Sequence, residues 1–496
     1  MRKIKILASI MMVLVLISPM TEAKKKKSKK PVKKHPAPVS RCAREDAVPL
    51  LGSFGLQRIV DEMNRKASSG VVVQSMRTKE LLYQQNANQL FSPASNMKVI
   101  TAYAALKFLG PNFVYYTRLM TDPGVMVNNG VLEGNLYLQY SGDPTLQLSD
   151  LDQLFNQLVQ RGIHTIRGRL MVDTSRYASE GSSPGTLESD ESYCYGAPVS
   201  TAILERNCVT FKISPTQVGR AAQVVFPYNV NLPINNHVVT RSSGRCHPTL
   251  QVQADGRYSI EGCTNAKSAG VAMTAVVLPD SHFGEQAAAS MLARKGIQVL
   301  GNNLPSAAEP EMQVIASYHS APLSILVVDM MKRSDNLIAN TLYKTVGAVY
   351  HQAPATWQNS GEAVRDILKT NQVNTQGMII MDGSGLSREN RVTPRQLVEV
   401  LIAAYQDPQV APVYLQALPV GGLDGTLKHR MGMRDVIGKV KAKTGTMAGV
   451  SSLSGYVETS TGELLVFSII VNDFNGGAYV YRSLQDRLCR VMRLSY

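Results

Sequence analysis

Residues 92–110 read SPASNMKVITAYAALKFLG, and this stretch predicts the structure around it. Its apolar residues and its boundaries are typical of a helix. Ser92 suits the N-cap and Pro93 the first helical position, which places Ser95 in the first turn, where backbone N–H groups lack partners within the helix. Lys98 follows on the same face. The sequence therefore predicts a helix that presents a hydroxyl, a free N–H and an amine together.

This arrangement predicts a nucleophile. A neutral Lys98 amine could take the proton of the Ser95 hydroxyl, and the free N–H, supported by the helix dipole, could stabilise an oxyanion. A Ser-x-x-Lys taken alone is more often a capped helix with a surface lysine. Here it occurs once in the whole chain.

A second polar triplet, Ser334-Asp335-Asn336, lies between two apolar helical stretches. A loop or helix start at this point would let Ser334 relay a proton and Asn336 hydrogen-bond an amide. Alone, the triplet is usually a polar helix cap.

A third segment, Lys443-Thr444-Gly445-Thr446, lies in a strand pattern. Lys443 would supply positive charge, the threonine hydroxyls would bind a carboxylate, and Gly445 would let another backbone approach closely. A substrate peptide could add there as an extra strand. The three motifs are common singly, but their occurrence in this order is far more specific.

With these motifs the chain resembles the low-molecular-mass class C penicillin-binding proteins, the D-alanyl-D-alanine carboxypeptidase/endopeptidase family S13. The long gap between the first and second motifs fits the two extra domains of that family. Further segments that resemble the family are SGDPTL (141–146), YGAPVS (195–200), DGSGLSREN (382–390) and LPVGGLDGTL (418–427).

The resemblance implies a role for each motif residue. Ser95 would be acylated by the D-Ala-D-Ala carbonyl with Lys98 as base, Ser334 would relay a proton to the leaving amine, and Asn336 would hold the substrate amide. Lys443 would supply electrostatic stabilisation, and water would release the acyl group. β-Lactams would act as covalent inhibitors.

The resemblance also implies substrate-binding residues. Thr444 and Thr446 would bind the terminal carboxylate, and the N–H groups of Ser95 and Thr446 would form the oxyanion hole. Asp190, with Met447 beside it, would receive the amino end of the peptide's third residue; an ordinary loop acid is an equal reading of Asp190.

The chain begins with targeting features. Residues 1–23 combine Arg2, Lys3 and Lys5 with an apolar run and a small residue at the end, which is typical of a signal peptide cleaved after Ala23; a retained anchor is the alternative. The resemblance then places the mature protein in the bacterial periplasm. No later stretch has the roughly 20 apolar residues of a spanning helix.

Basic residues concentrate in a tail at 24–41, whose like charges and prolines preclude a packed core. The formal charge of +15 falls to +13 without residues 1–23, which hold three basic residues and one acidic, and to +4 without the nine basic residues of the tail. This argues against nucleic-acid binding and for a tail that meets anionic envelope polymers or lipid headgroups; a solubilising spacer is an equal alternative.

The predicted fold class is α/β (α+β), a serine β-lactamase/D,D-peptidase-like domain with two inserted, β-rich subdomains. Residues 42–116 and 318–496 would form the D,D-peptidase domain, 117–207 and 266–317 the inserted domain II, and 208–265 the inserted domain III. Segments 149–161 and 282–295 are predicted helices.

Six cysteines in an exported chain indicate disulfides, with 15 possible pairings. Cys194 with Cys208 and Cys246 with Cys263 are local pairs, and the resemblance favours the first; it also implies packed terminal helices and thus a Cys42–Cys489 bridge. No motif predicts a metal site, and no cofactor is expected.

Two other functions compete with the peptidase: a β-lactamase of the same serine mechanism, and a non-catalytic module that binds peptidoglycan or β-lactams. The long insertion disfavours the first, and the intact set of motif residues disfavours the second. The sequence leaves open carboxypeptidase against endopeptidase preference and the oligomeric state.

Overall fold

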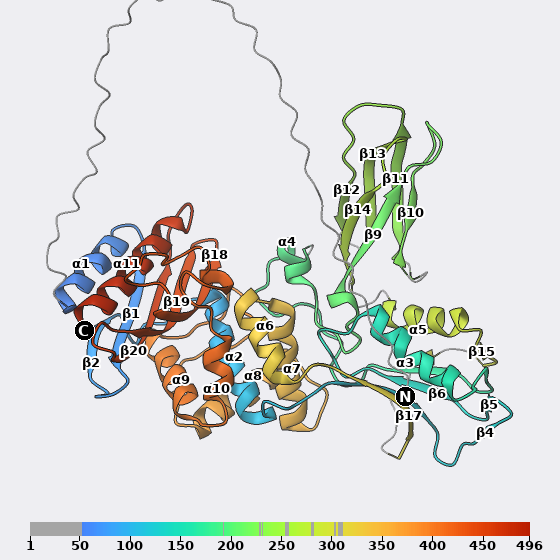
Figure 1. Cartoon of the computed structure of the whole chain (residues 1–496), viewed down its shortest axis with the longest axis horizontal. Coiled ribbons are helices and arrows are strands. Elements are labelled where there is room, and N and C mark those ends of the chain that lie inside the picture. The colour runs from blue at the N-terminus through green and yellow to red at the C-terminus, as the bar shows by residue number, and fades with distance from the viewer. Residues whose placement is uncertain are drawn as a thin grey trace, which may run out of the picture. The chain divides into compact units, whose positions relative to one another are not determined.

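The computed structural model describes residues 52–496 except 192, 228–229, 231, 253–256, 279–281, 302–303 and 306–310 (Figure 1). The predicted signal peptide, the basic tail and Cys42 lie outside the described residues.

A five-stranded antiparallel sheet, ordered β18-β19-β20-β1-β2, forms the frame of the site. Its first strands in the chain lie before the long insertion and its last three after it. The strands are β1 (Ser68–Ser75), β2 (Leu81–Gln85), β18 (Val440–Met447), β19 (Val450–Glu458) and β20 (Leu464–Asn472).

Both faces of this sheet are covered by helices, because alternate strand residues point to opposite faces. Val71 and Val73 face α1 and α11, whereas Val72 and Ile470 face the core that includes α2, α7 and α9. Figure 1 shows α1 and α11 together on one side of the sheet. The helices are α1 (Gly52–Asn64), α2 (Met97–Leu109), α6 (Leu323–Arg333), α7 (Asn336–His351), α8 (Trp357–Thr370), α9 (Pro394–Gln406), α10 (Ala411–Ala417) and α11 (Tyr479–Ser495).

Among the described residues, the region between α2 and α6 contains four further sheets, which makes it richer in strands than the rest. A five-stranded sheet, β16-β8-β6-β3-β17, begins and ends this region, since β3 pairs with β17. Its strands are β3 (Tyr116–Thr121), β6 (Leu136–Gln139), β8 (Leu170–Asp173), β16 (Leu304–Pro305) and β17 (Gln313–His319), and a small sheet holds β4 (Val127–Asn128), β5 (Val131–Leu132), β7 (Thr165–Ile166) and β15 (Gln298–Val299).

Two helices fall where the sequence predicts them. α3 (Leu148–Gln160) and α5 (Phe283–Arg294) bury their apolar faces in the second large core, together with β3 and β6. A third short helix, α4 (Glu188–Glu191), carries Asp190.

Two three-stranded sheets occupy the middle of the region, ordered β10-β9-β14 and β11-β13-β12. The sheet of β9 continues past the predicted boundary at 265, because β14 pairs with β9; the division of the chain into domains stays a prediction. The strands are β9 (Cys208–Ser214), β10 (Gln223–Val225), β11 (Ile234–Arg241), β12 (Thr249–Val252), β13 (Tyr258–Asn265) and β14 (Val271–Val276).

Both local disulfides are present, Cys194–Cys208 and Cys246–Cys263. Cys489 is a buried thiol with no disulfide partner among the described residues. The predicted Cys42–Cys489 bridge stays untested, since Cys42 lies outside them.

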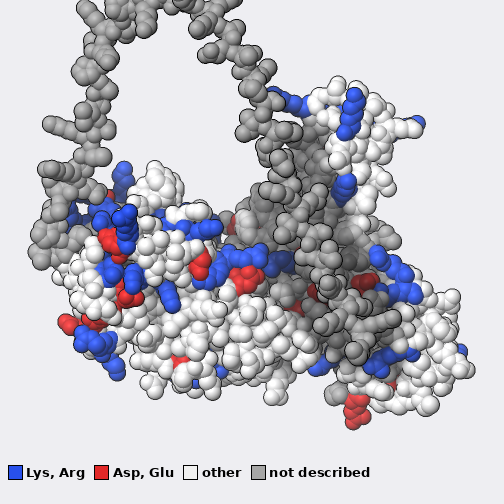
Figure 2. All heavy atoms as spheres, in the orientation of Figure 1, with Lys and Arg blue, Asp and Glu red and all other residues white. Residues whose placement is uncertain are grey.

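Charge is mixed on the described surface. Figure 2 shows Lys and Arg side chains interspersed with Asp and Glu around α1 and α11, where ion pairs such as Arg487–Glu62 form. Within the described ranges, no helix has the length and apolarity to cross a bilayer, and no cluster of three or more His, Cys, Asp or Glu side chains could hold a metal.

Candidate active site

Ser95 lies in a 3-10 turn, Ala94–Asn96, directly before α2. The predicted cap is wrong in detail: Ser92 does not cap the helix, and its buried Oγ has no hydrogen-bond partner in the structure. Tertiary contacts set the turn instead, because the Asn472 side chain binds both the N–H and the carbonyl of Ser92 at 2.7 and 3.0 Å. Ala94 takes a left-handed φ of 47°. Ser95 still precedes the helix, and its N–H has no acceptor among the described residues.

Lys98 is fully buried one turn after Ser95. Its Nζ lies 3.1 Å from Ser95 Oγ, 2.7 Å from Asn336 Oδ1 and 2.7 Å from the Ser384 carbonyl. Burial lowers the pKa of Lys98 to about 7, against the opposing effect of the Asp382 and Asp335 carboxylates. Lys98 can therefore lose its proton near neutral pH without losing its hydrogen-bond partners.

The Ser-Asp-Asn triplet joins α6 to α7. Ser334 ends α6 with a left-handed φ of 58°, and Asp335 caps α7 by accepting the N–H of Ile338 at 2.9 Å. This turn aims Ser334 at the third motif, since Lys443 Nζ donates to Ser334 Oγ at 2.8 Å. It aims Asn336 at the first motif through Lys98.

Lys443 is also fully buried, on the edge strand β18. Burial lowers its pKa well below the ordinary value, and the nearby Lys98 lowers it further. A bound carboxylate would favour its charged form. Thr444 donates its hydroxyl to Thr426 at 2.8 Å, and Thr446 accepts from Arg482 at 3.2 Å.

The free edge of β18 faces outward at Thr444 and Thr446. Ala442 donates its N–H to Pro419, away from β19, so the two-residue alternation of an antiparallel strand turns the N–H groups of Thr444 and Thr446 outward as well. An extended peptide could pair with this edge.

Gly445 allows the strand and the Ser95 turn to meet. A Cβ at Gly445 would lie 2.2 Å from Ser452 Oγ, 2.8 Å from the Pro93 carbonyl and 3.0 Å from Ser95 N. Ser452 itself donates to the Pro93 carbonyl at 2.6 Å. The three motifs are thus brought together in one site.

Asp190 and Met447 are not joined by any contact among the described residues. The Asp190 carboxylate accepts from the Tyr195 hydroxyl at 2.8 Å, and the Tyr195 carbonyl accepts from Asn336 Nδ2 at 2.9 Å. Met447 ends β18 beside the turn to β19. Asp190 is therefore linked to Asn336 through Tyr195.

Sequence reasoning gave no role to several residues of the site. The loop 382–390 is folded around the buried Asp382, which accepts hydrogen bonds from five donors in the loop and thereby fixes the Ser384 carbonyl against Lys98. The donors are Ser384 Oγ, the N–H groups of Gly385, Leu386 and Ser387, and Asn390 Nδ2. The DGSGLSREN resemblance was a signal for this loop, and YGAPVS was one for Tyr195.

Arg206 had no signal in the sequence. Its guanidinium forms an ion pair with Asp335, whose side chain is 9% exposed. Arg206 belongs to a turn in which Glu205, Arg206 and Asn207 all have left-handed φ angles of 49°, 62° and 50°. Left-handed φ angles raise the conformational energy of non-glycine residues. The surrounding structure nevertheless keeps this turn, which places Arg206 beside Asp335.

Comparison with known proteins agrees with this geometry. Residues 56–492 match the D-Ala-D-Ala carboxypeptidase 3 (S13) family. The chain is 28% identical over 439 residues to D-alanyl-D-alanine carboxypeptidase DacB of Haemophilus influenzae, covering 87% of this chain and 91% of that protein. It is 33% identical over 436 residues to D-alanyl-D-alanine carboxypeptidase of Actinomadura sp., covering 83% and 79%.

A solved structure is similar over the same length. The crystal structure of penicillin binding protein 4 (dacB) from Haemophilus influenzae superposes with a TM-score of 0.76 at 28% identity, covering 88% of this chain and 97% of that chain. A second structure of that protein, in complex with a β-lactam, gives a TM-score of 0.71 at 26% identity, covering 88% and 98%.

The fold and the three clustered motifs define a serine hydrolase of the penicillin-binding class. The chain belongs to the D-Ala-D-Ala carboxypeptidase 3 (S13) family, and it is a serine-type carboxypeptidase. The predicted family and fold class are confirmed.

Proposed function

We propose that the enzyme cleaves D-Ala-D-Ala bonds of peptidoglycan stem peptides through an acyl-enzyme on Ser95. The observation that carries this is the 3.1 Å distance from Ser95 Oγ to a buried lysine whose pKa is lowered to about 7. Neutral Lys98 takes the hydroxyl proton as Ser95 Oγ bonds to the carbonyl carbon. The outward N–H groups of Ser95 and Thr446 stabilise the oxyanion.

The leaving amine takes its proton from the second and third motifs. Ser334 Oγ accepts a hydrogen bond from Lys443 Nζ, and in the proposed reaction it relays a proton to the nitrogen of the terminal D-alanine as the C–N bond breaks. Water then attacks the ester carbonyl and its proton returns to the Ser334–Lys443 pair. As the C–O bond breaks, the Lys98 ammonium gives its proton to Ser95 Oγ, which frees the shortened peptide and restores the Ser95 hydroxyl.

The substrate is held along β18. The peptide backbone pairs with the open edge near Thr444 and Thr446, and the peptide amide hydrogen-bonds to Asn336. The terminal carboxylate accepts hydrogen bonds from the two threonine hydroxyls and is attracted by the positive charge of Lys443. Carboxylate binding favours the ammonium form of Lys443, which burial opposes in the empty site.

We propose further that Asp190 and Met447 receive the amino end of the third peptide residue. The support is the path from Asp190 through Tyr195 to Asn336. Asp190→Asn should raise KM for substrates with a free amine at that residue, whereas Glu188→Gln in the same short helix should not. Equal KM values for the two variants would remove Asp190 from the site.

The proposal extends to cross-linked substrates, β-lactam inhibition and the location of the enzyme. The enzyme also splits peptide cross-links, and β-lactams acylate Ser95 as substrate analogues. Export by the signal peptide to the periplasm brings it to its substrate, and the basic tail contacts anionic envelope surfaces. A variant without residues 24–34 should sediment less with envelope fragments at low salt, and unchanged sedimentation would leave the tail a spacer.

The deciding experiment compares wild type with Ser95→Ala on a muropeptide ending in D-Ala-D-Ala and on cross-linked dimers, with products read by mass spectrometry. Loss of one D-Ala, or splitting of the dimer, by wild type alone is expected and reports the preferred bond. No turnover of either substrate would contradict the proposal, and fast turnover of penicillin would identify a β-lactamase.

A further inference from the structure

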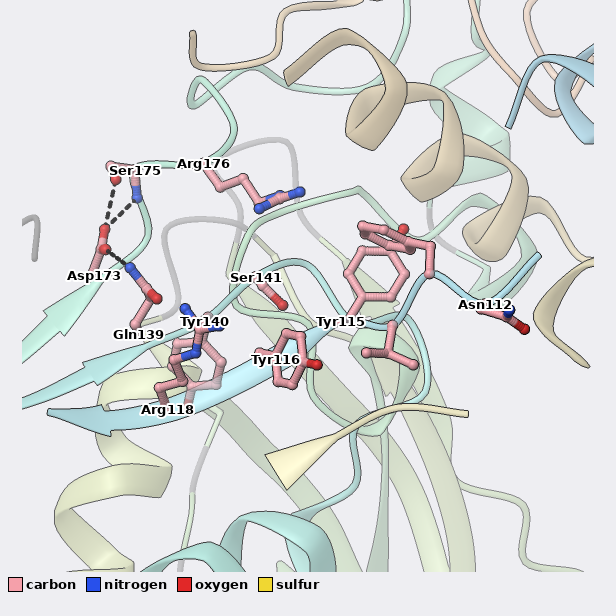
Figure 3. Close-up of a pocket in the computed structure, with 12 residues that line it drawn as sticks. Asn112, Tyr115, Tyr116, Arg118, Gln139, Tyr140, Ser141, Asp173, Ser175 and Arg176 are labelled. Carbon is pink, nitrogen blue, oxygen red and sulfur yellow. Dashed lines mark hydrogen bonds between the residues drawn. The ribbon is translucent and has the colours of Figure 1, made fainter. Parts of the chain in front are cut away.

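A cavity of about 570 Å³ lies apart from the three motifs, and Figure 3 shows its walls. Its lining comes from the segment after α2, from the strands β3 and β6, and from the loop after β8. Because α2 rises about 1.5 Å per residue over 13 residues, its two ends are separated by about 20 Å, with Ser95 before one end and this cavity beyond the other. None of the motif residues lines it.

Two buried polar atoms of the lining have no partner. Ser141 is 9% exposed, and both its Oγ and the Nε of Arg176 lack any hydrogen bond in the structure. Figure 3 shows the Ser141 hydroxyl and the Arg176 guanidinium on the side of the cavity where Tyr115 and Tyr116 lie. A buried donor without an acceptor costs about 1–3 kcal/mol, so these atoms are arranged for an acceptor that the chain itself does not provide.

The cavity lining has two arginines without a carboxylate partner in the described ranges, and its one carboxylate already has hydrogen-bond donors. In the described part of the chain, neither Arg118 nor Arg176 has a carboxylate within ion-pair distance; Arg118 lies 4.7 Å over the Tyr116 ring. The one lining carboxylate, Asp173, already accepts from Gln139 Nε2 at 3.0 Å and from the N–H and hydroxyl of Ser175 at 2.9 and 2.7 Å. The unsatisfied Nε of Arg176 is a donor, and the Ser141 hydroxyl can donate beside it.

We propose that this cavity is a second binding site that takes a carboxylate of a short acidic peptide. Guanidinium groups bind carboxylates with paired, charge-assisted hydrogen bonds, and the Ser141 hydroxyl adds a third donor. The tyrosine walls supply apolar contact for the peptide around the carboxylate, and the volume lies within the range of sites that enclose small ligands. Phosphate shares the anionic chemistry, but it would leave the aromatic walls unused.

The test titrates a stem tripeptide with free carboxylates into the Ser95→Ala protein by isothermal titration calorimetry. The probe has no D-Ala-D-Ala bond and the protein has no nucleophile, so the result is independent of the proposed hydrolysis. Saturable binding is expected, and Arg118→Gln with Arg176→Gln should raise Kd at least tenfold. Ser141→Ala, which removes one hydroxyl, should raise Kd severalfold.

Controls separate the alternatives. Arg77→Gln, which alters an exposed arginine paired with Glu463, should leave Kd unchanged, and thermal unfolding checks that each variant folds. The peptide with amidated carboxylates should bind more weakly. Unchanged affinity in both the double arginine variant and Ser141→Ala overturns the proposal, as does inorganic phosphate binding as tightly as the tripeptide, which would mean an adventitious ion only.

Discussion

Arg206, in the long segment between the first and second motifs, forms an ion pair with Asp335, the middle residue of Ser-Asp-Asn. Asp335 uses its other oxygen to cap α7 at the Ile338 N–H, 2.9 Å away. The residues on either side of Asp335 contact Lys443 and Lys98. The inserted segment therefore helps to position the side chains of the three motifs.

Arg206→Gln should lower kcat about tenfold with little change in KM. The mostly buried carboxylate of Asp335 would lose its charged partner, and the turn that carries Ser334 and Asn336 would shift. Arg206→Lys should restore part of the rate. Steady-state kinetics with thermal unfolding measures this, and a lower melting temperature with unchanged kcat would show a role in stability only.

Removing the disulfide Cys194–Cys208 should reduce activity more than removing Cys246–Cys263. The first bridge joins the neighbour of Tyr195, which binds Asn336, to the strand that follows Arg206. The two bridges close loops of similar length, with sequence separations of 14 and 17 residues. Because a disulfide stabilises mainly by restricting the unfolded chain, each double Cys→Ser variant should lose about 3 kcal/mol of folding free energy.

The comparison of the two double variants by melting temperature and acylation rate distinguishes the bridges. Similar losses of stability with a slower reaction in the first variant alone are expected. Equal rates in both variants would contradict a link from the first disulfide to the site.

The acylation rate should rise as the pH passes through about 7. Lys98 must be neutral to accept a proton, and its lowered pKa of about 7 makes the neutral form dominant above that pH. A pH profile of kcat/KM measures this. Lys98→Arg should be inactive across the range, because a guanidinium does not release its proton. A flat wild-type profile from pH 5.5 to about 8.5 would argue against Lys98 as the base.

Gly385→Ala should abolish most activity and destabilise the protein. Gly385 has φ 84°, and an added Cβ would lie 1.9 Å from the Ala94 carbonyl and 3.0 Å from Ser95 N, so the nucleophile turn would have to move. Gly462 has the same φ of 84° with nothing within 4 Å, so Gly462→Ala is a matched control. It should cost only about 1 kcal/mol of stability, with full activity.

Chemical denaturation gives the free energy of unfolding of the two glycine variants, and turnover of substrate gives their activity. Equal behaviour of the two would mean that the cost at Gly385 comes from its φ angle alone.

The elements with clear periodicity could be predicted from the sequence. α3 and α5 fall within two residues of the predicted helices. Spacing made Cys194 with Cys208 and Cys246 with Cys263 candidate pairs, and the resemblance favoured the first; both bridges are present. These features depend on residues close together in the chain.

The features that could not be predicted depend on contacts between distant residues. Ser92 has the composition of a cap, but Asn472, far along the chain, binds its backbone and sets a different turn. Arg206 lies in an ordinary stretch of sequence, and only the fold brings it to Asp335. The DGSGLSREN resemblance marked the loop of Ser384, but only the fold shows that the backbone carbonyl of this residue accepts from Lys98.

The pairing of β1 with β20 has a consequence for how the enzyme matures. These strands lie near opposite ends of the described chain, with Val71 opposite Ile469, and the strand that carries Lys443 reaches β1 only through β19 and β20. A nascent chain that ends before β20 cannot complete this sheet, so the strand of Lys443 joins the strands that precede Ser95 only after β20 has been made. Such long-range pairing also makes folding slow. The site is thus assembled only after translation has passed β20, long after the Ser95 helix has been made.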